Sequence, residues 1–157
     1  MKVLLIEDDE EKATKVSGFV SSEYKGAEIA VARSINSGLR ALISGVGSLD
    51  VVLLDMTLPS FDVSPQEPSG GAPENFAGRE LLAQMKLRGI EIPTIVVTQF
   101  DSFGEGDAKV SLNTLATELS SQYGAQFKGY VYYNSAQEGW RAALDKMIKE
   151  NIGIGAS

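Results

Sequence analysis

The feature that most constrains this chain is a short apolar run that ends in a single carboxylate. Residues 51–54 are Val-Val-Leu-Leu, and Asp55 follows directly. Four consecutive apolar residues predict a strand that is buried on both faces, which is typical of a parallel sheet covered by helices. Functional side chains gather at the carboxyl ends of such strands. We therefore expect Asp55 to lie at a functional edge of an α/β sheet.

A second apolar run with the same ending opens the chain. Residues 3–6 are Val-Leu-Leu-Ile, and they are followed by Glu7, Asp8 and Asp9. If this strand and the strand before Asp55 are parallel neighbours, three or four carboxylates meet at one edge of the sheet. Such a cluster repels itself unless a cation is present. Because the donors are all oxygens, the sequence predicts a Mg²⁺ site.

The composition excludes several classes of protein and of chemistry. A chain of 157 residues can form one domain with a sizeable core. It has no cysteine and no histidine, which excludes disulfides, thiolate or imidazole metal sites and histidine-based catalysis. A net charge of −7 argues against nucleic-acid binding. No long apolar segment or signal peptide is seen, so we expect no membrane association and a cytoplasmic location.

Strands and helices are expected to alternate along the chain. Apolar runs predict five strands, at residues 2–6, 27–31, 50–54, 92–98 and 127–133. Apolar residues at helical spacing predict five helices, at residues 9–22, 35–44, 78–88, 108–123 and 135–149. This alternation predicts an α/β fold, a flavodoxin-like doubly wound five-stranded parallel sheet of order 2-1-3-4-5 with helices on both faces.

Two polar segments interrupt this alternation. Residues 60–77 and 99–107 are rich in glycine, proline or acidic residues and are expected to form long loops. Both leave the sheet edge that carries Asp55. The segment 60–77 is therefore either a lid and partner surface or disordered filler. We expect a single domain over residues 1–150 and a flexible tail over 151–157.

With these residues laid out, the chain resembles a response-regulator receiver domain of two-component signalling. The matching segments are Glu-Asp-Asp at 7–9, Leu-Leu-Asp-Met-Thr-Leu-Pro at 53–59, Ile-Pro-Thr-Ile-Val-Val-Thr at 92–98 and Phe-Lys-Gly-Tyr-Val at 127–131. The resemblance covers nearly the whole chain apart from the two long loops and the tail. It implies that Asp55 accepts a phosphoryl group from a histidine kinase or phosphotransfer protein.

The resemblance also assigns roles in metal binding. It implies that Asp8 coordinates Mg²⁺ directly, together with Asp55, and that Glu7 helps through water. The main-chain carbonyl of Thr57 completes the ligands from the protein. Carboxylate-held Mg²⁺ neutralises charge, which is most of what phosphoryl transfer to a carboxylate requires.

Two further positions are assigned to switching. Thr98 is expected to hydrogen-bond a phosphoryl oxygen, and Tyr130 matches the switch aromatic whose ring moves inward in response. The output is then expected at the surface formed by residues 108–123, 127–133 and 135–149, where an effector protein binds and where receiver domains also form homodimers.

The chain departs from the receiver pattern at important positions. The family's phosphate-pairing lysine falls at Tyr133, and the usual proline after it is Asn134. Lys128 does not substitute, because five residues of strand place it about 16 Å away, toward the wrong end of the sheet. The bulky Gln99 after Thr98 is expected to crowd the phosphoryl site. These departures predict weakened phosphoryl transfer and switching.

Three functions follow from these observations. The first is a stand-alone receiver domain that is phosphorylated on Asp55, signals by protein contact and is not an enzyme. The second is a degenerate pseudo-receiver that acts as a phosphorylation-independent interaction module, which the missing lysine favours. The third is a Mg²⁺-dependent phosphohydrolase with Asp55 as nucleophile, for which Asp9 or Asp101 is the available acid or base.

Overall fold

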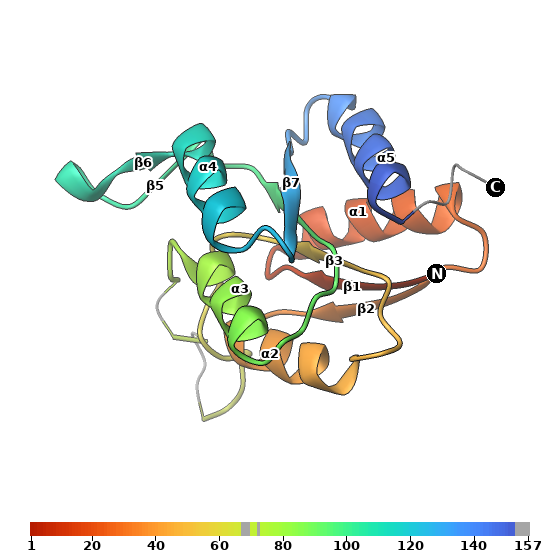
Figure 1. The fold of residues 1–157 in the computed structure, drawn as a ribbon, viewed down its shortest axis with the longest axis horizontal. Coiled ribbons are helices and arrows are strands. Elements are labelled where there is room, and N and C mark those ends of the chain that lie inside the picture. The colour runs from red at the N-terminus through yellow and green to blue at the C-terminus, as the bar shows by residue number, and fades with distance from the viewer. Residues whose placement is uncertain (67–69, 72, 153–157) are drawn as a thin grey trace.

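A computed structural model describes residues 1–66, 70–71 and 73–152. Its centre is a five-stranded parallel sheet of order β2-β1-β3-β4-β7, which confirms the predicted topology (Figure 1). The strands are β1 (Lys2–Ile6), β2 (Glu28–Ala32), β3 (Val51–Leu54), β4 (Thr94–Thr98) and β7 (Phe127–Tyr132). Strands β1, β3 and β4 are inside the sheet, and β3 and β4 are buried along their whole length.

Helices cover both faces of this sheet. They are α1 (Glu10–Glu23), α2 (Ile35–Ser44), α3 (Ala77–Leu87), α4 (Leu112–Gln122) and α5 (Gly139–Ile152). Because side chains alternate along a strand, Leu4 and Ile6 of β1 pack toward α2, α3 and α4, whereas Val3 and Leu5 pack toward α1 and α5. None of the helices within the described part of the chain is both long and apolar enough to cross a membrane.

The expected loop at residues 99–107 is wrong in part, because the segment forms a small antiparallel hairpin. Strands β5 (Ser102–Phe103) and β6 (Val110–Ser111) pair around the 3₁₀ turn η1 (Gly106–Ala108), so that α4 begins at residue 112 rather than 108. The side chain of Phe103 is buried and packs against Phe76 and Phe100. Gly104 has φ +88°, and a Cβ there would lie 2.7 Å from the carbonyl oxygen of Ala108. The buried Phe103 side chain and the turn at Gly104 therefore stabilise the hairpin in this polar segment.

The last helix is displaced relative to the expectation of residues 135–149. The Asn134 side chain accepts a hydrogen bond from the amide of Ala136, which forms a turn and delays the start of α5 to Gly139. The helix then continues through Asn151 and Ile152, two residues that were expected to belong to the tail. The remainder of the expected tail, 153–157, lies outside the described residues.

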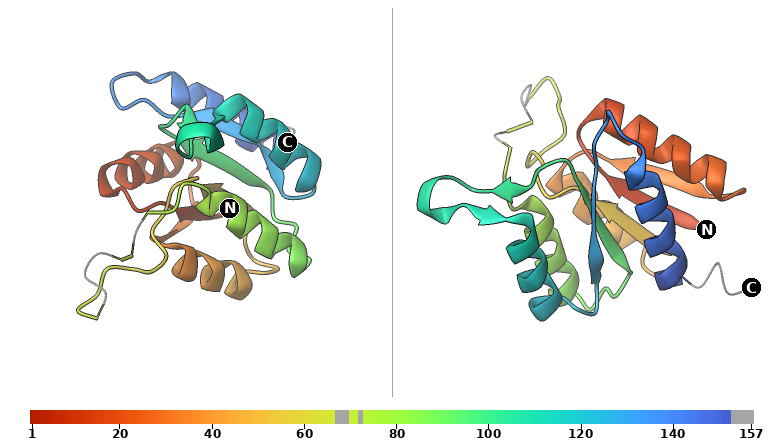
Figure 2. Two further views of the ribbon diagram at one scale, coloured as in Figure 1. Left: turned by 90° about the vertical axis from the view of Figure 1, so that its left-hand side faces the viewer. Right: turned by 90° about the horizontal axis from the view of Figure 1, so that it is seen from above.

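The segment between β3 and α3 is attached beside the start of α2. Leu58 forms an antiparallel bridge with Glu74, and the amide of Ile35 donates to the carbonyl of Pro59. The Asp62 carboxylate accepts hydrogen bonds from the hydroxyl of Ser34, at 2.6 Å, and from that of Ser37. Residues 67–69 and 72 of this expected loop lie outside the described part. Figure 2 shows this segment and the β5–β6 hairpin leaving the same end of the sheet in different directions.

Candidate functional site

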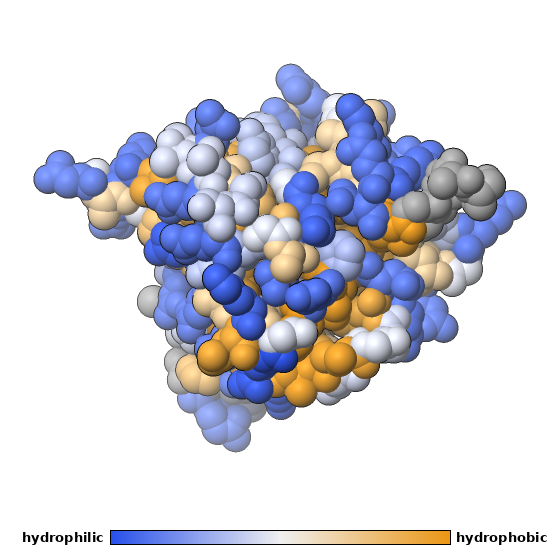
Figure 3. Space-filling model, in the orientation of Figure 1, coloured by the Kyte–Doolittle hydropathy of each residue, from blue (hydrophilic) through white to orange (hydrophobic). Residues whose placement is uncertain are grey.

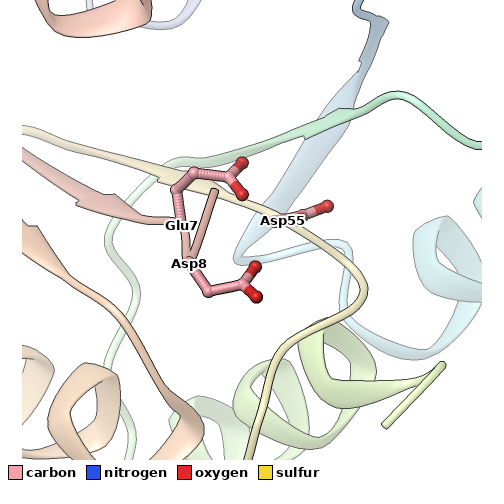
Figure 4. A group of neighbouring side chains, drawn as sticks. All are labelled: Glu7, Asp8 and Asp55. Carbon is pink, nitrogen blue, oxygen red and sulfur yellow. The ribbon is translucent and has the colours of Figure 1, made fainter. Parts of the chain in front are cut away.

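Three carboxylates meet at the carboxyl edge of the sheet, as predicted. Glu7 and Asp8 follow β1, Asp55 follows β3, and these two strands are hydrogen-bonded neighbours. One carboxylate oxygen from each residue lies within 4.8 Å of those from the other two (Figure 4). Glu7 and Asp55 are 1% and 4% exposed, whereas Asp8 is open to solvent. The cluster is therefore accessible from one side only.

Backbone contacts fix the orientation of Asp55. Its amide donates to the carbonyl of Ile6 at 3.0 Å, and one carboxylate oxygen, Oδ1, accepts from the amide of Met56 at 2.8 Å. Gly78 at the start of α3 packs directly behind this turn, since a Cβ there would lie 3.0 Å from the carbonyl oxygen of Asp55. The carboxylate is thus held on a rigid turn between strand and helix.

A buried lysine, Lys12, enters this cluster from α1. Its Nζ lies 2.6 Å from Glu7 Oε1 and 3.5 Å from Asp55 Oδ1, and it donates to the carbonyl oxygen of Val97 at 2.7 Å. The side chain is 2% exposed. Three acceptors therefore surround the ammonium group, which matches its three N–H donors.

The start of α1 places Lys12 at this position. The Asp9 side chain caps the helix by accepting a hydrogen bond from the amide of Lys12 at 3.1 Å. The lysine then continues the inward-facing stripe of Ala13, Val16 and Val20, so its side chain runs along the sheet toward the carboxylates. The ring of Tyr133 lies 5.8 Å from Nζ.

The electrostatics of the cluster favour an additional cation. Burial and then the negative charge of Asp55 raise the pKa of Glu7, and the Lys12 ammonium opposes this rise. The same two effects, in the same order, raise the pKa of Asp8. Three carboxylates facing one ammonium group leave excess negative charge, and all of the free donors are hard oxygens. This donor set fits Mg²⁺.

The other residues predicted for the site lie around the cluster. Thr98 is fully buried at the end of β4, where its Oγ1 accepts a hydrogen bond from the amide of Phe100 at 3.2 Å. Thr57 is half-buried two residues after Asp55. Tyr130 lies on the outermost strand β7 and is 36% exposed. The roles assigned to these residues stay predictions.

The position expected to carry a lysine is filled by a packed aromatic ring. Tyr133 is 3% exposed and contacts Trp140 at 5.1 Å between ring centroids, and its hydroxyl has no hydrogen-bond partner within the described residues. Lys128 reaches in the other direction and donates to the carbonyl of Gly124, which confirms that it does not serve the site. A cavity of about 450 Å³ lies next to Lys12, with Gln99 and Tyr133 in its wall.

Sequence reasoning missed Lys12, although a signal was present. Lys12, Val16 and Val20 are spaced by four residues, which places the lysine on the buried stripe of α1. A charged residue within an apolar stripe indicates a buried partner of opposite charge.

Comparison with known proteins agrees with the fold. No protein-family profile matches the sequence. The chain is 33% identical over 150 residues to the Detocs response regulatory protein DtcB of Enterobacter cloacae. This alignment covers 96% of this chain and 99% of DtcB. The chain is 34% identical over 146 residues to the uncharacterized protein y4jR of Sinorhizobium fredii, with 92% and 94% covered.

Solved structures show the same fold at lower sequence identity. A response-regulator receiver domain from Clostridium thermocellum superimposes with a TM-score of 0.65 at 21% identity, covering 99% of this chain and 96% of the other. A receiver domain from Methanospirillum hungatei gives a TM-score of 0.61 at 22% identity, with 97% and 93% covered. Together with the match to DtcB, they show that this chain belongs to the response-regulator receiver family.

Proposed function

We propose that this protein is a working receiver domain that accepts a phosphoryl group on Asp55 from a histidine kinase or phosphotransfer protein. The observation that carries the proposal is the placement of Asp55. It is buried, fixed by the Met56 amide and surrounded by the carboxylates of Glu7 and Asp8 and by one ammonium group. A rigid carboxylate in a charge-compensated site is suited to act as a nucleophile toward phosphorus.

In the proposed transfer, a carboxylate oxygen of Asp55 attacks the phosphorus of a phosphohistidine. An O–P bond forms as the P–N bond breaks, and the electron pair of that bond stays on the leaving imidazole nitrogen, which takes a proton. Oδ1 of Asp55 accepts a hydrogen bond from the Met56 amide and faces Lys12. The second oxygen, Oδ2, is therefore the better placed nucleophile. The product is an aspartyl phosphate.

Mg²⁺ would be held by Glu7, Asp8 and Asp55 together with the carbonyl oxygen of Thr57. When bound, it neutralises charge on the carboxylates and on the phosphoryl oxygens. The support for this assignment is the all-oxygen donor set within 4.8 Å and its excess negative charge. Asp8 is the exposed member of the set, so a hydrated ion can reach it first.

We propose that output occurs by protein contact at the surface of α4, β7 and α5. Strand β7 is the last strand of the sheet, and Tyr130 and Tyr132 are exposed there with 36% and 48% of their surface accessible. The Thr98 hydroxyl sits on the strand next to β7, where a new hydrogen bond to a phosphoryl group would draw it away from the Phe100 amide. Exposed tyrosines are suited to partner recognition. DtcB, which is named a response regulatory protein, is matched over 99% of its length.

Intact-mass measurement tests this proposal. The protein and the matched variant Asp55→Asn are incubated with a small phosphoramidate, with and without Mg²⁺. We expect a Mg²⁺-dependent gain of one phosphoryl group in the wild type and none in Asp55→Asn. A wild type that gains no mass while it still binds Mg²⁺ would contradict the proposal and would indicate a phosphorylation-independent interaction module.

A further inference from the structure

We propose that Lys12 is the phosphate-pairing cation of this site, supplied by α1 instead of by the strand residue at position 133. The inference rests on the proposed phosphorylation of Asp55 and identifies a further residue that acts directly on the phosphoryl group. It explains how the site can function with an aromatic ring where the family pattern has a lysine.

The contacts of Lys12 place a positive charge beside the acceptor. Nζ is 3.5 Å from Asp55 Oδ1 and 2.6 Å from Glu7 Oε1, at the cluster shown in Figure 4. Once Asp55 carries a phosphoryl group, additional anionic oxygens stand in front of the carboxylate. The ammonium can then exchange the weaker, 3.5 Å contact for a phosphoryl oxygen and keep its bonds to Glu7 and Val97.

Positions 12 and 133 approach the site from the same face of the sheet. Both side chains belong to the layer between the sheet and helices α1 and α5, where Tyr133 packs against Trp140. The Tyr133 ring lies 5.8 Å from the Lys12 Nζ and forms one wall around it. An aromatic face attracts an ammonium group and keeps water from it. The Tyr133 ring thus occupies the position where a lysine was expected, and it stabilises the ammonium group of Lys12, which we propose takes the role of that lysine.

Two local costs argue that Lys12 has more than a structural role. A charge that is 2% exposed is expensive to desolvate, and a buried ion pair is often replaceable by apolar side chains without loss of stability. The lysine also occupies the first turn of α1, where the positive end of the helix dipole disfavours a cation. Departures from local preference of this kind are expected at functional sites.

A lysine-relocation experiment tests the inference. The variants are Lys12→Met, the double variant Lys12→Met/Tyr133→Lys, and the matched control Lys15→Met, which removes an exposed lysine that pairs with Glu11 on the same helix. We expect Lys12→Met to gain the phosphoryl group about ten- to hundredfold more slowly than wild type, because a charge-assisted contact to the phosphoryl group is lost. Lys15→Met should react at the wild-type rate, and Tyr133→Lys should restore part of the lost rate.

Mg²⁺ affinity provides a second readout that does not depend on phosphoryl transfer. Trp140 is the single tryptophan and contacts Tyr133, so its fluorescence reports on the surroundings of Lys12. We expect Lys12→Met to bind Mg²⁺ more tightly than wild type, because the ammonium no longer competes for Glu7 and Asp55. A general structural defect would instead weaken Mg²⁺ binding.

The outcomes separate this inference from the proposed function. If wild type gains no phosphoryl group, the proposed function fails and the role of Lys12 fails with it. If wild type and Lys12→Met react equally fast, only the role of Lys12 is overturned. If Lys12→Met does not fold, the role of Lys12 can be tested by NMR on wild-type protein labelled with ¹⁵N-lysine. The Nζ resonance of Lys12 is expected to shift when Mg²⁺ and beryllofluoride bind, and an unchanged resonance would overturn the inference.

Discussion

At the scale of single residues, stability and function depend on how each buried charge is matched. Glu7, Lys12 and Asp55 are all nearly inaccessible to solvent, and the Lys12 ammonium contacts both carboxylates and the backbone carbonyl of Val97. The net interaction energy of such a group is small, because desolvation offsets most of the attraction. Its value lies in a fixed geometry that is in place before a phosphoryl group arrives.

The hydrogen bond between Tyr24 and Asp145 gives a residue-scale prediction of pH dependence. The Tyr24 hydroxyl, at the end of α1, donates to the Asp145 carboxylate of α5 at 2.5 Å. This bond, followed by the contact with Lys149, lowers the pKa of Asp145. A carboxylate whose pKa is lower in the folded than in the unfolded state contributes stability above the unfolded pKa, and loses it as the pH falls through the folded pKa.

We therefore expect Tyr24→Phe to reduce the free energy of unfolding by about 1–2 kcal/mol at neutral pH. The difference from wild type should be the same at pH 7 and pH 5 and should shrink below about pH 4, where aspartate takes up a proton. Urea unfolding at several pH values measures it, with Tyr132→Phe, on an exposed side chain, as the control. A difference that stays constant down to pH 3 would show that the bond does not depend on an ionised Asp145.

At the scale of elements, the site is built where strands end and helices begin. Strands β1 and β3 deliver the carboxylates, and α1 delivers Lys12. The start of α3 closes the turn after Asp55, because the amide of Gly78 donates to the carbonyl of Met56 at 3.0 Å. A side chain at residue 78 would meet Met56 Cε at 2.9 Å and the Asp55 carbonyl oxygen at 3.0 Å.

This close approach predicts opposite effects for two glycine-to-alanine substitutions. Gly78→Ala should lower the free energy of unfolding by about 1–3 kcal/mol, because the new methyl group is forced into a packed turn. It should also slow phosphoryl gain at the displaced Asp55. Gly18→Ala in α1 meets no atom within 4 Å and should raise stability by about 0.5–1 kcal/mol through helix propensity. Equal effects at the two positions would contradict the described packing around Asp55.

At the scale of the whole molecule, the acidic cluster, the exposed apolar residues and the exposed tyrosines lie on different surfaces. The acidic cluster lies at the carboxyl edge of the sheet, from which the β5–β6 hairpin and the segment after β3 also leave. Figure 3 shows apolar residues gathered over α2 and α3, and the exposed apolar side chains of this region include Ile43, Val46 and Leu87. The tyrosines of β7 lie on a separate edge between α4 and α5.

The sequence was sufficient to predict the sheet order and the position of Asp55, since apolar runs and right-handed crossovers leave few alternatives. It was not sufficient for the β5–β6 hairpin, whose stability depends on the burial of Phe103 against distant residues such as Phe76. Lys12 was missed for a related reason. Its spacing from Val16 places it on the buried stripe of α1, and Glu7 is close to it in the chain, but two of its three partners, Asp55 and Val97, are remote and become neighbours only in the folded sheet.

A structure of the protein with Mg²⁺ and beryllofluoride, a stable mimic of the phosphoryl group, tests the central claim most directly. We predict a beryllium atom bonded to an oxygen of Asp55, Mg²⁺ on the oxygens of Glu7, Asp8 and Asp55, and Lys12 Nζ within hydrogen-bond distance of a fluorine. A complex that lacks beryllofluoride on Asp55 would contradict phosphorylation at this site. A complex in which beryllofluoride is bound but Lys12 stays on Glu7 and Val97 alone would contradict the role proposed for the lysine.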